Sequence, residues 1–305
     1  MVPEEGAAAL LPAAFGAWFR RRGWSLRPHQ REMLRAAVEG VDALLIAPTG
    51  GGKTLGGFLP SLVELAGGGH WPGLHTLYVS PLKALATDVG RNLAAPVEEM
   101  GLAVRFELRT GDTPQNRRRR QRERPPEILL TTPESLALLL SYPDSAAFFA
   151  PLRTVILDEV HALADNKRGA LLSLGTARLR TLAPGARFTG LSATVARPDL
   201  VLRYLTPEPE RARIVRGSAG AAPVIRIVLP EASMPWAGHF ALYAVPEILE
   251  LIRSCRTTLV FVNTRAQAEL VFGGLWRANK DALPIALHHG SLAVEQRRKV
   301  EAAMA

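Results

Sequence analysis

The sequence predicts an α/β fold: a parallel sheet with helices on both of its faces. Short apolar runs rich in Val, Ile and Leu alternate with longer amphipathic segments. This alternation is typical of strands that are buried on both faces and joined by helices. In addition, a glycine-rich segment directly follows one apolar run and opens an amphipathic segment, as the first strand-to-helix turn of such a sheet does.

Five apolar runs are predicted to be buried strands, at 43–47, 75–80, 128–131, 154–157 and 188–191. Four segments between them are predicted to be helices, at 54–66, 81–99, 133–140 and 169–182. In the first of these helices, apolar residues such as Leu55, Phe58 and Leu59 recur at helical spacing. Ligands of an open α/β sheet bind at the carboxyl ends of its strands. The residues that follow each run are therefore the candidate site residues.

The pattern divides the chain into two domains and a linker. Residues 1–205 are expected to form the first α/β domain. Residues 206–240 are rich in Pro, Arg, Gly and Ala and are expected to be a linker, with one strand-like stretch at 224–228. Residues 241–305 are expected to begin a second α/β domain.

The second domain is predicted to contain helices at 244–254 and 266–279 and strands at 258–262 and 284–288. A parallel sheet of two strands cannot bury both of its faces. We therefore expect the chain to be truncated in its second domain.

Composition narrows the class of protein. No apolar run approaches the roughly 20 residues of a membrane span, and acidic residues stand near the N-terminus where a secretory signal is basic. The single cysteine, Cys255, excludes an internal disulfide and suits a reducing compartment. A cytoplasmic protein is predicted, with no membrane partner.

The net charge of +9 favours a polyanionic partner such as nucleic acid. The alternative is a bias in coding composition, because only five of the 37 basic residues are lysine.

Residues 47–54 read Ala-Pro-Thr-Gly-Gly-Gly-Lys-Thr and have the pattern and context of a phosphate-binding loop, or P-loop. Its backbone N–H groups can surround phosphates at the start of a helix. The loop residues predicted to do so are Thr49, Gly50, Gly51 and Gly52. Lys53 is predicted to reach the β- and γ-phosphates, and the Thr54 hydroxyl to bind Mg²⁺. ATP and Mg²⁺ are therefore the expected cofactors; a glycine-rich loop without a ligand is the alternative.

The apolar run 154–157 ends in Asp158-Glu159-Val160-His161. Two adjacent carboxylates at the end of a buried strand are costly unless they meet a cation or a reacting water. With a P-loop in the same sheet, Asp158 is predicted to hold Mg²⁺ and Glu159 to polarise the attacking water. His161 is expected to contact the nucleotide or a partner domain. Without the P-loop, the same residues would be interpreted as a helix N-cap.

The order of these motifs resembles that of superfamily 2 helicases. In this resemblance, Arg27-Pro28-His29-Gln30 matches the adenine-recognition element, in which Gln30 reads the base edge. Ser192-Ala193-Thr194 matches the motif that couples the state of ATP to the grip on nucleic acid, which implicates Ser192 and Thr194.

Several further segments resemble the strand-binding motifs of that superfamily. The candidates in the first domain are Pro81, Lys83, Thr110, Gly111, Thr132 and Pro133. Most are expected at strand-to-helix turns, where hydroxyl and N–H groups contact phosphates regardless of base sequence. Thr132 and Pro133 also suit an ordinary helix start, and the two interpretations are compatible. The candidates in the second domain are Asn263, Thr264, Arg265, His289 and Gly290.

The large helicase-related (Lhr) family has motifs similar in sequence to segments 80–85, 158–161, 234–239 and 288–291. Within that family, the resemblance is nearest to the DEXH helicases encoded beside a DNA ligase. The resemblance covers residues 13–298. It implies two RecA-like domains and an ATP-dependent DNA repair helicase that moves 3′ to 5′ along single strands. The implied partners are single-stranded or partly duplex DNA and a DNA ligase or other repair proteins.

Family members continue with an arginine motif that completes the ATP site. We therefore expect this chain to bind nucleotide but to hydrolyse it poorly.

Three alternatives stay open. A P-loop kinase or small-molecule ATPase would give residues 192–194 and 263–265 no role and would not respond to DNA. A non-catalytic fragment would bind nucleotide and nucleic acid without turnover, and a helicase could act on RNA instead of DNA.

Two other patterns are given ordinary interpretations. The run Arg117–Arg120, with Arg122 and Arg124, is interpreted as a solvated loop in preference to a strand contact. His288 and His289 are adjacent and point different ways, so they do not suggest a metal pair.

Overall fold

The computed structural model describes residues 10–304 except 68, 194, 219–223 and 231–240. The chain divides into two units, residues 1–222 and residues 223–305, called here the first and the second unit. Each is described by itself. None of the described helices combines the length and the apolar composition that crossing a bilayer requires.

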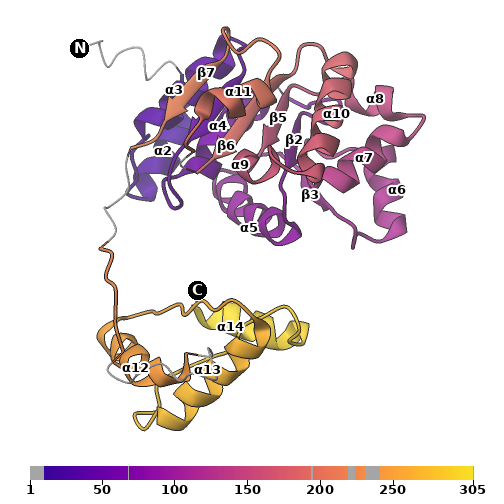
Figure 1. The fold of residues 1–305 in the computed structure, drawn as a ribbon. Helices are drawn as coiled ribbons and strands as arrows, with labels where there is room; N and C mark the ends of the chain where they lie inside the picture. The colour runs from indigo at the N-terminus through magenta and orange to yellow at the C-terminus, as the bar shows by residue number, and fades with distance from the viewer. Residues whose placement is uncertain (1–9, 68, 194, 219–223, 231–240, 305) are drawn as a thin grey trace. The chain divides into compact units, whose positions relative to one another are not determined.

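The first unit contains a sheet of seven strands in the order β3-β4-β2-β5-β6-β1-β7. Every neighbouring pair is parallel, so the predicted α/β class with a parallel sheet is confirmed (Figure 1). The strands are β1 Ala43–Ile46, β2 Thr76–Val79, β3 Phe106–Arg109, β4 Ile128–Thr131, β5 Thr154–Leu157, β6 Arg187–Ser192 and β7 Arg213–Arg216.

Helices cover both faces of this sheet. Side chains of α2–α5 belong to one core cluster and those of α7–α11 to the other. Alternate residues of β1 serve the two clusters: Leu45 lies in the first, and Leu44 and Ile46 in the second. The helices are α2 Ala13–Arg21, α3 Pro28–Val38, α4 Lys53–Gly67, α5 Lys83–Glu99, α6 Gln115–Glu123, α7 Pro133–Ser141, α8 Ser145–Phe149, α9 Val160–Leu163, α10 Lys167–Leu182 and α11 Pro198–Leu205.

The five predicted strands are all present, but two strands and several helices, α6 among them, were not predicted. β3 and β7 form the two edges of the sheet, and each carries charged side chains among its four residues. β7 lies in the segment expected to be a linker, so that segment is ordered into the sheet as far as Arg216. The arginine run was interpreted as a loop and is instead the helix α6. An edge strand pairs on one side only and stays partly solvated, so it can carry charged residues. Such a strand does not appear in the sequence as an apolar run.

The second unit contains η1 Leu242–Ala244, α12 Val245–Ser254, α13 Arg265–Ala278 and α14 Val294–Met304. Both predicted helices are present, and α12 packs on α13 through a small apolar cluster. The predicted strands at 224–228, 258–262 and 284–288 are not strands, and no strand occurs among the described residues of this unit. A strand takes its hydrogen bonds from neighbouring strands, and without a ladder Leu259 and Phe261 stay 61% and 88% exposed.

Candidate functional site

The glycines of the P-loop are required by its backbone. Gly50 and Gly52 have φ angles of 75° and 77°, in the left-handed region where a side chain is strained. At Gly51, whose φ is not positive, a Cβ atom would lie 2.7 Å from the carbonyl oxygen of Pro48. The loop therefore curls tightly between β1 and α4. Thr49 and Gly50 are exposed on it, and Thr54 is half-buried in the first turn of α4.

Lys53 is paired with a carboxylate from another strand end. Its side chain is buried, and its Nζ lies 2.8 Å from Oε1 of Glu159. β1 and β5 are separated in the sheet by β6 alone, so parallel topology brings both strand ends to one edge. The P-loop and the DEVH segment, predicted from separate parts of the sequence, lie side by side.

Glu159 has an unusual backbone conformation. Its φ and ψ are 46° and 45°, which is left-handed and uncommon for a residue with a side chain. Such conformations persist where surrounding structure enforces them and are concentrated at functional sites. Its Oε2 lies 3.4 Å from Nδ1 of His161, so the carboxylate stands between the lysine and the histidine.

Asp158 is held in one orientation by two hydrogen bonds. Oδ2 accepts from the Tyr78 hydroxyl at 2.5 Å, and Oδ1 accepts from the backbone N–H of Glu159 at 2.9 Å. Burial raises the pKa of Asp158, and the bond from Tyr78 and the charge of Lys53 oppose that rise. Burial and the charge of Asp158 in turn raise the pKa of Tyr78, so the phenol keeps its proton and acts as a donor.

Tyr78 is a site residue that sequence reasoning missed. It lies in the middle of β2, is fully buried, and comes from a strand whose other residues are Thr, Leu and Val. A buried tyrosine hydroxyl almost always has a hydrogen-bond partner. A tyrosine inside an apolar run was therefore a signal that a polar group lay beside that strand.

The DEVH segment is connected to the Ser192 motif. Nδ1 of His161 lies 2.9 Å from Oγ of Ser192, a fully buried residue at the end of β6. Of the two residues predicted to couple ATP to nucleic acid, Ser192 therefore touches the candidate catalytic segment. Thr194 lies outside the described residues, as does the predicted motif segment 234–239.

Gln30 touches the P-loop directly. Its Oε1 accepts from the backbone N–H of Arg27 at 3.0 Å, and its Nε2 donates to the carbonyl oxygen of Gly52 at 3.3 Å. The residue is 2% exposed. A Cβ atom at Gly52 would lie 2.9 Å from that same Nε2, which is a second reason for glycine there.

The candidate phosphate contacts of the first unit follow β2, β3 and β4, three adjacent strands. Pro81 and Lys83 follow β2, and Lys83 Nζ lies 2.8 Å from Oδ1 of Asp112. Thr110 and Gly111 follow β3 in the same turn as Asp112.

Thr132 and Pro133 follow β4 and start α7. Thr132 occupies the N-cap position and Pro133 the first turn, as predicted, but the Thr132 side chain makes no capping bond to the backbone. Its hydroxyl instead donates to Ser135 Oγ at 3.3 Å.

The candidates of the second unit also lie together. Thr264 caps α13, and Arg265 Nη1 donates to Ser291 Oγ at 2.7 Å. Asn263 N–H donates to Gln267. Segments 263–265 and 288–291, predicted separately, are thus neighbours. His289 pairs with Glu269 at 2.8 Å next to Gly290.

The described residues contain no cluster of three or more His, Cys, Asp or Glu side chains able to hold a metal ion. His288 pairs with Glu301, a different partner from that of His289.

Tyr78→Phe is expected to destabilise the protein by about 1–3 kcal/mol, because it leaves the buried Asp158 carboxylate one donor short. Nucleotide binding in the presence of Mg²⁺ is expected to weaken as well, since Asp158 loses its fixed orientation. Urea unfolding and titration with a fluorescent ADP analogue measure the two effects.

Tyr204→Phe is the matched control for that change. It removes a half-buried hydroxyl that donates to the Gly169 carbonyl at 2.7 Å, away from Asp158. It should cost about 0.5–1.5 kcal/mol and leave nucleotide binding unchanged. Equal behaviour of the two variants in the nucleotide titration would refute the role given to Tyr78.

Comparison with known proteins identifies relatives of this arrangement. A family model described as DEAD/DEAH box helicase matches residues 27–201. The chain is 36% identical to a "Lhr helicase/ probable uracil glycosylase" of Mycolicibacterium smegmatis, over 93% of this chain and 22% of that protein. It is 35% identical to an "ATP-dependent helicase Lhr-Core" of Methanocaldococcus jannaschii, over 98% of this chain and 37% of that protein.

A solved structure shows the same fold. It is that of the Mycobacterium smegmatis helicase Lhr bound to ssDNA and AMP-PNP, with a TM-score of 0.81 and 36% identity over 97% of this chain and 40% of that one. The resemblance to Lhr helicases and the RecA-like fold that it implied are thereby confirmed. The chain spans well under half the length of each of these relatives.

Proposed function

Because the chain belongs to the DEAD/DEAH box helicase family, we propose that it is the ATP-dependent motor part of a helicase or translocase that moves on single-stranded DNA. One observation carries this proposal. Lys53 of the P-loop contacts Glu159 of the DEVH segment, which adjoins His161 and, through it, Ser192. A P-loop, a water-activating carboxylate and a coupling serine in contact are the parts that an ATP-driven motor needs.

The ATP site is proposed to use the P-loop for binding and Glu159 for chemistry. The backbone of Thr49–Gly52 would surround the phosphates, and Lys53 would leave Glu159 to pair with them. Glu159, released from Lys53, would accept the proton of the attacking water. Gln30, already on the P-loop, would read the adenine base.

Mg²⁺ fits the residues present. The ion prefers oxygen ligands and is commonly bound by one or two carboxylates together with substrate phosphates. The Thr54 hydroxyl and the Asp158 carboxylate, oriented by Tyr78, are the proposed ligands. When bound, the ion neutralises charge on the phosphates; the protein's part is to orient its two ligands.

The nucleic-acid surface of the first unit is proposed to be the turns that follow β2, β3 and β4. In the second unit it is proposed to be the adjoining segments 263–265 and 288–291. Binding of ssDNA by the related Lhr structure supports DNA as the ligand. Movement from 3′ to 5′, a role in DNA repair and a DNA ligase partner rest on the motif resemblance. A single exposed thiol, Cys255, and a nucleic-acid ligand support a cytoplasmic location.

The test is to measure nucleotide binding and ATP hydrolysis with no nucleic acid, with single-stranded DNA and with single-stranded RNA. Nucleotide binding and hydrolysis stimulated by DNA would support the proposal. Greater stimulation by RNA would indicate an RNA-directed helicase. Binding of both ligands without turnover would make this chain a non-catalytic fragment. Turnover indifferent to both nucleic acids would overturn the proposal in favour of a small-molecule kinase or ATPase.

A further inference from the structure

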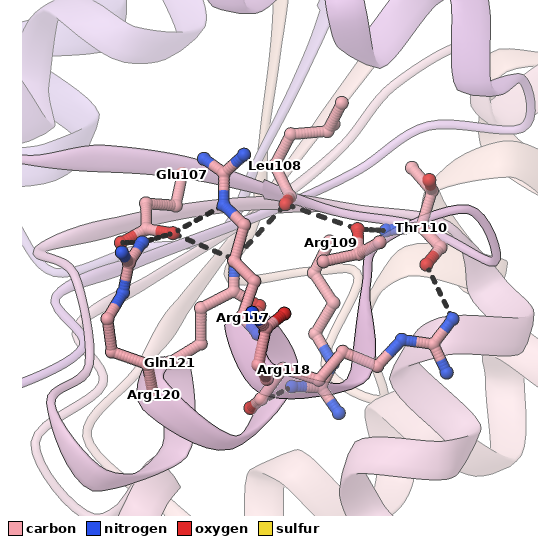
Figure 2. Close-up of polar contacts among 10 residues, drawn as sticks. Glu107, Leu108, Arg109, Thr110, Arg117, Arg118, Arg120 and Gln121 are labelled. Carbon is pink, nitrogen blue, oxygen red and sulfur yellow. Dashed lines mark hydrogen bonds and ion pairs between the residues drawn. The ribbon is translucent and has the colours of Figure 1, made fainter.

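The arginine run on α6 has no part in the proposed ATP site, yet its side chains are not simply solvated. Three side chains of α6 converge on the Glu107 carboxylate of β3 (Figure 2). Arg117 Nε, Arg120 Nη2 and Gln121 Nε2 lie 3.1, 3.0 and 3.0 Å from Oε2 of Glu107. Gln121 is fully buried and also donates to the Leu108 carbonyl at 3.1 Å. α6 is therefore fastened along β3.

The charge of Glu107 is maintained by this arrangement. Burial raises the pKa of Glu107, but hydrogen bonds from Gln121, Arg117 and Arg120 outweigh it and hold the pKa below its usual value. The Glu107 carboxylate is thus charged at neutral pH and keeps its ion pairs and hydrogen bonds with α6.

Arg118 points the opposite way, onto the turn after β3. Its Nη2 donates to the backbone carbonyl of Thr110 at 3.1 Å and to that of Gly111 at 2.6 Å. Its own carbonyl accepts from Arg109 Nη1 at 2.9 Å, and Arg109 is 2% exposed. A buried arginine therefore fixes Arg118, and Arg118 fixes the turn (Figure 2).

The turn that Arg118 holds contains candidate phosphate contacts. The Thr113 hydroxyl accepts from Thr110 N–H at 2.9 Å, and Thr113 N–H donates to the Thr110 carbonyl at 3.1 Å. Asp112, at the tip, holds Lys83. The position of this turn therefore also sets the position of the neighbouring lysine.

We propose that Arg118 is a positioning residue for nucleic acid. It fixes the Thr110–Thr113 turn by donating hydrogen bonds to two carbonyl groups of that turn, and the turn, together with Lys83, contacts the phosphates. The exposed arginines of the run are not the contact. A phosphate is repelled by free carbonyl oxygens and attracted by N–H groups, so a guanidinium on two carbonyls both fixes the turn and offsets their negative ends. Holding the turn in its bound shape lowers the entropy lost on binding. This inference rests on the nucleic-acid surface proposed above.

The test compares Arg118→Ala with Arg119→Ala in binding of a fluorescent single-stranded DNA. Both remove one positive charge from the same helix. The Arg119 side chain is 76% exposed and, among the described residues, pairs only with Glu123, four residues away on α6. Arg118→Ala is expected to raise the Kd about tenfold, and Arg119→Ala to leave it within about twofold. Equal losses would mean that the run acts through its charge and would overturn the proposal.

Salt dependence separates positioning from direct contact. The logarithm of the association constant falls linearly with the logarithm of the salt concentration, and each lost phosphate contact makes this slope shallower by about 1. Arg118→Ala should weaken binding with its slope unchanged, since Arg118 touches carbonyls and not DNA. A slope shallower by about 1 would show that Arg118 itself binds phosphate and would refute the proposal.

Arg118→Lys guards against misfolding and adds a second criterion. Both carbonyls accept from Nη2, the far end of the arginine side chain. Lysine keeps the charge, but its side chain is one bond shorter and cannot reach both carbonyls from the same position, whereas at a phosphate it serves as a point charge. If Arg118 positions the turn, Arg118→Lys should bind DNA several-fold more weakly than the unaltered chain. If Arg118 contacts DNA directly, Arg118→Lys should bind DNA as the unaltered chain does. Retained binding of a fluorescent ADP analogue shows that a variant is folded. Failure of the unaltered chain to bind DNA would instead refute the proposed function.

Discussion

Glu159→Gln is expected to lower the rate of ATP hydrolysis by about 10²–10⁴-fold while nucleotide binding is retained. Glutamine has nearly the same shape as glutamate but cannot accept a proton from water. The Glu159 carboxylate also pairs with Lys53, whose Nζ lies 2.8 Å from its Oε1. Removing its charge frees Lys53 for the phosphates, so nucleotide binding should be equal or tighter. Slow hydrolysis with undiminished binding is the signature of a residue that acts in the chemical step.

Single-turnover hydrolysis, with the protein in excess over ATP, isolates that step from product release. Glu32→Gln is the matched control, because Glu32 is a half-buried carboxylate on α3 that pairs with Arg35 and Arg213 and has no part in the proposed site. It should leave hydrolysis within about twofold. A Glu159→Gln protein whose rate stays within threefold of the unaltered chain would exclude Glu159 as the base.

Lys53→Ala is expected to weaken nucleotide binding by about 10- to 100-fold and to remove measurable hydrolysis with it. The Lys53 side chain is 8% exposed, and its ammonium group lies at the edge of the sheet where the phosphates are proposed to bind. Charge-assisted bonds in such a protected site are stronger than those on an open surface. The change also leaves Glu159 without its cation, which adds repulsion toward an incoming phosphate.

Titration with a fluorescent ADP analogue measures this effect, and Lys167→Ala is its control. Lys167 is an exposed lysine at the start of α10, so its loss changes net charge equally but should not affect binding. If both variants bind nucleotide alike, the P-loop assignment of Lys53 is wrong.

The central strands could be predicted because burial on both faces leaves them mainly apolar. β1, β2, β4, β5 and β6 all read as short runs of this kind. The edge strands could not be predicted in this way: Phe106–Arg109 and Arg213–Arg216 each contain two charged residues. An edge strand is identified by the partner it pairs with, and that partner is far away in the chain.

Local pattern also failed where the contacts of a segment decide its structure. The run Arg117–Arg120 carries four like charges in succession, which disfavours an isolated helix. It is helical because Glu107 and the turn carbonyls offset those charges. In the second unit the apolar pattern at 258–262 predicted a strand, but a pattern supplies no hydrogen-bond partners.

The chemical groups of the site and their order along the chain could be identified from the sequence alone, because the P-loop and the DEVH segment are each defined by spacing within a few residues. Which of these groups contact one another depends on how the chain folds. Lys53 and Glu159 are 106 residues apart, Tyr78 and Asp158 are 80 apart, and His161 and Ser192 are 31 apart. These contacts follow from the strand order β2-β5-β6-β1, which depends on how whole strands pack together.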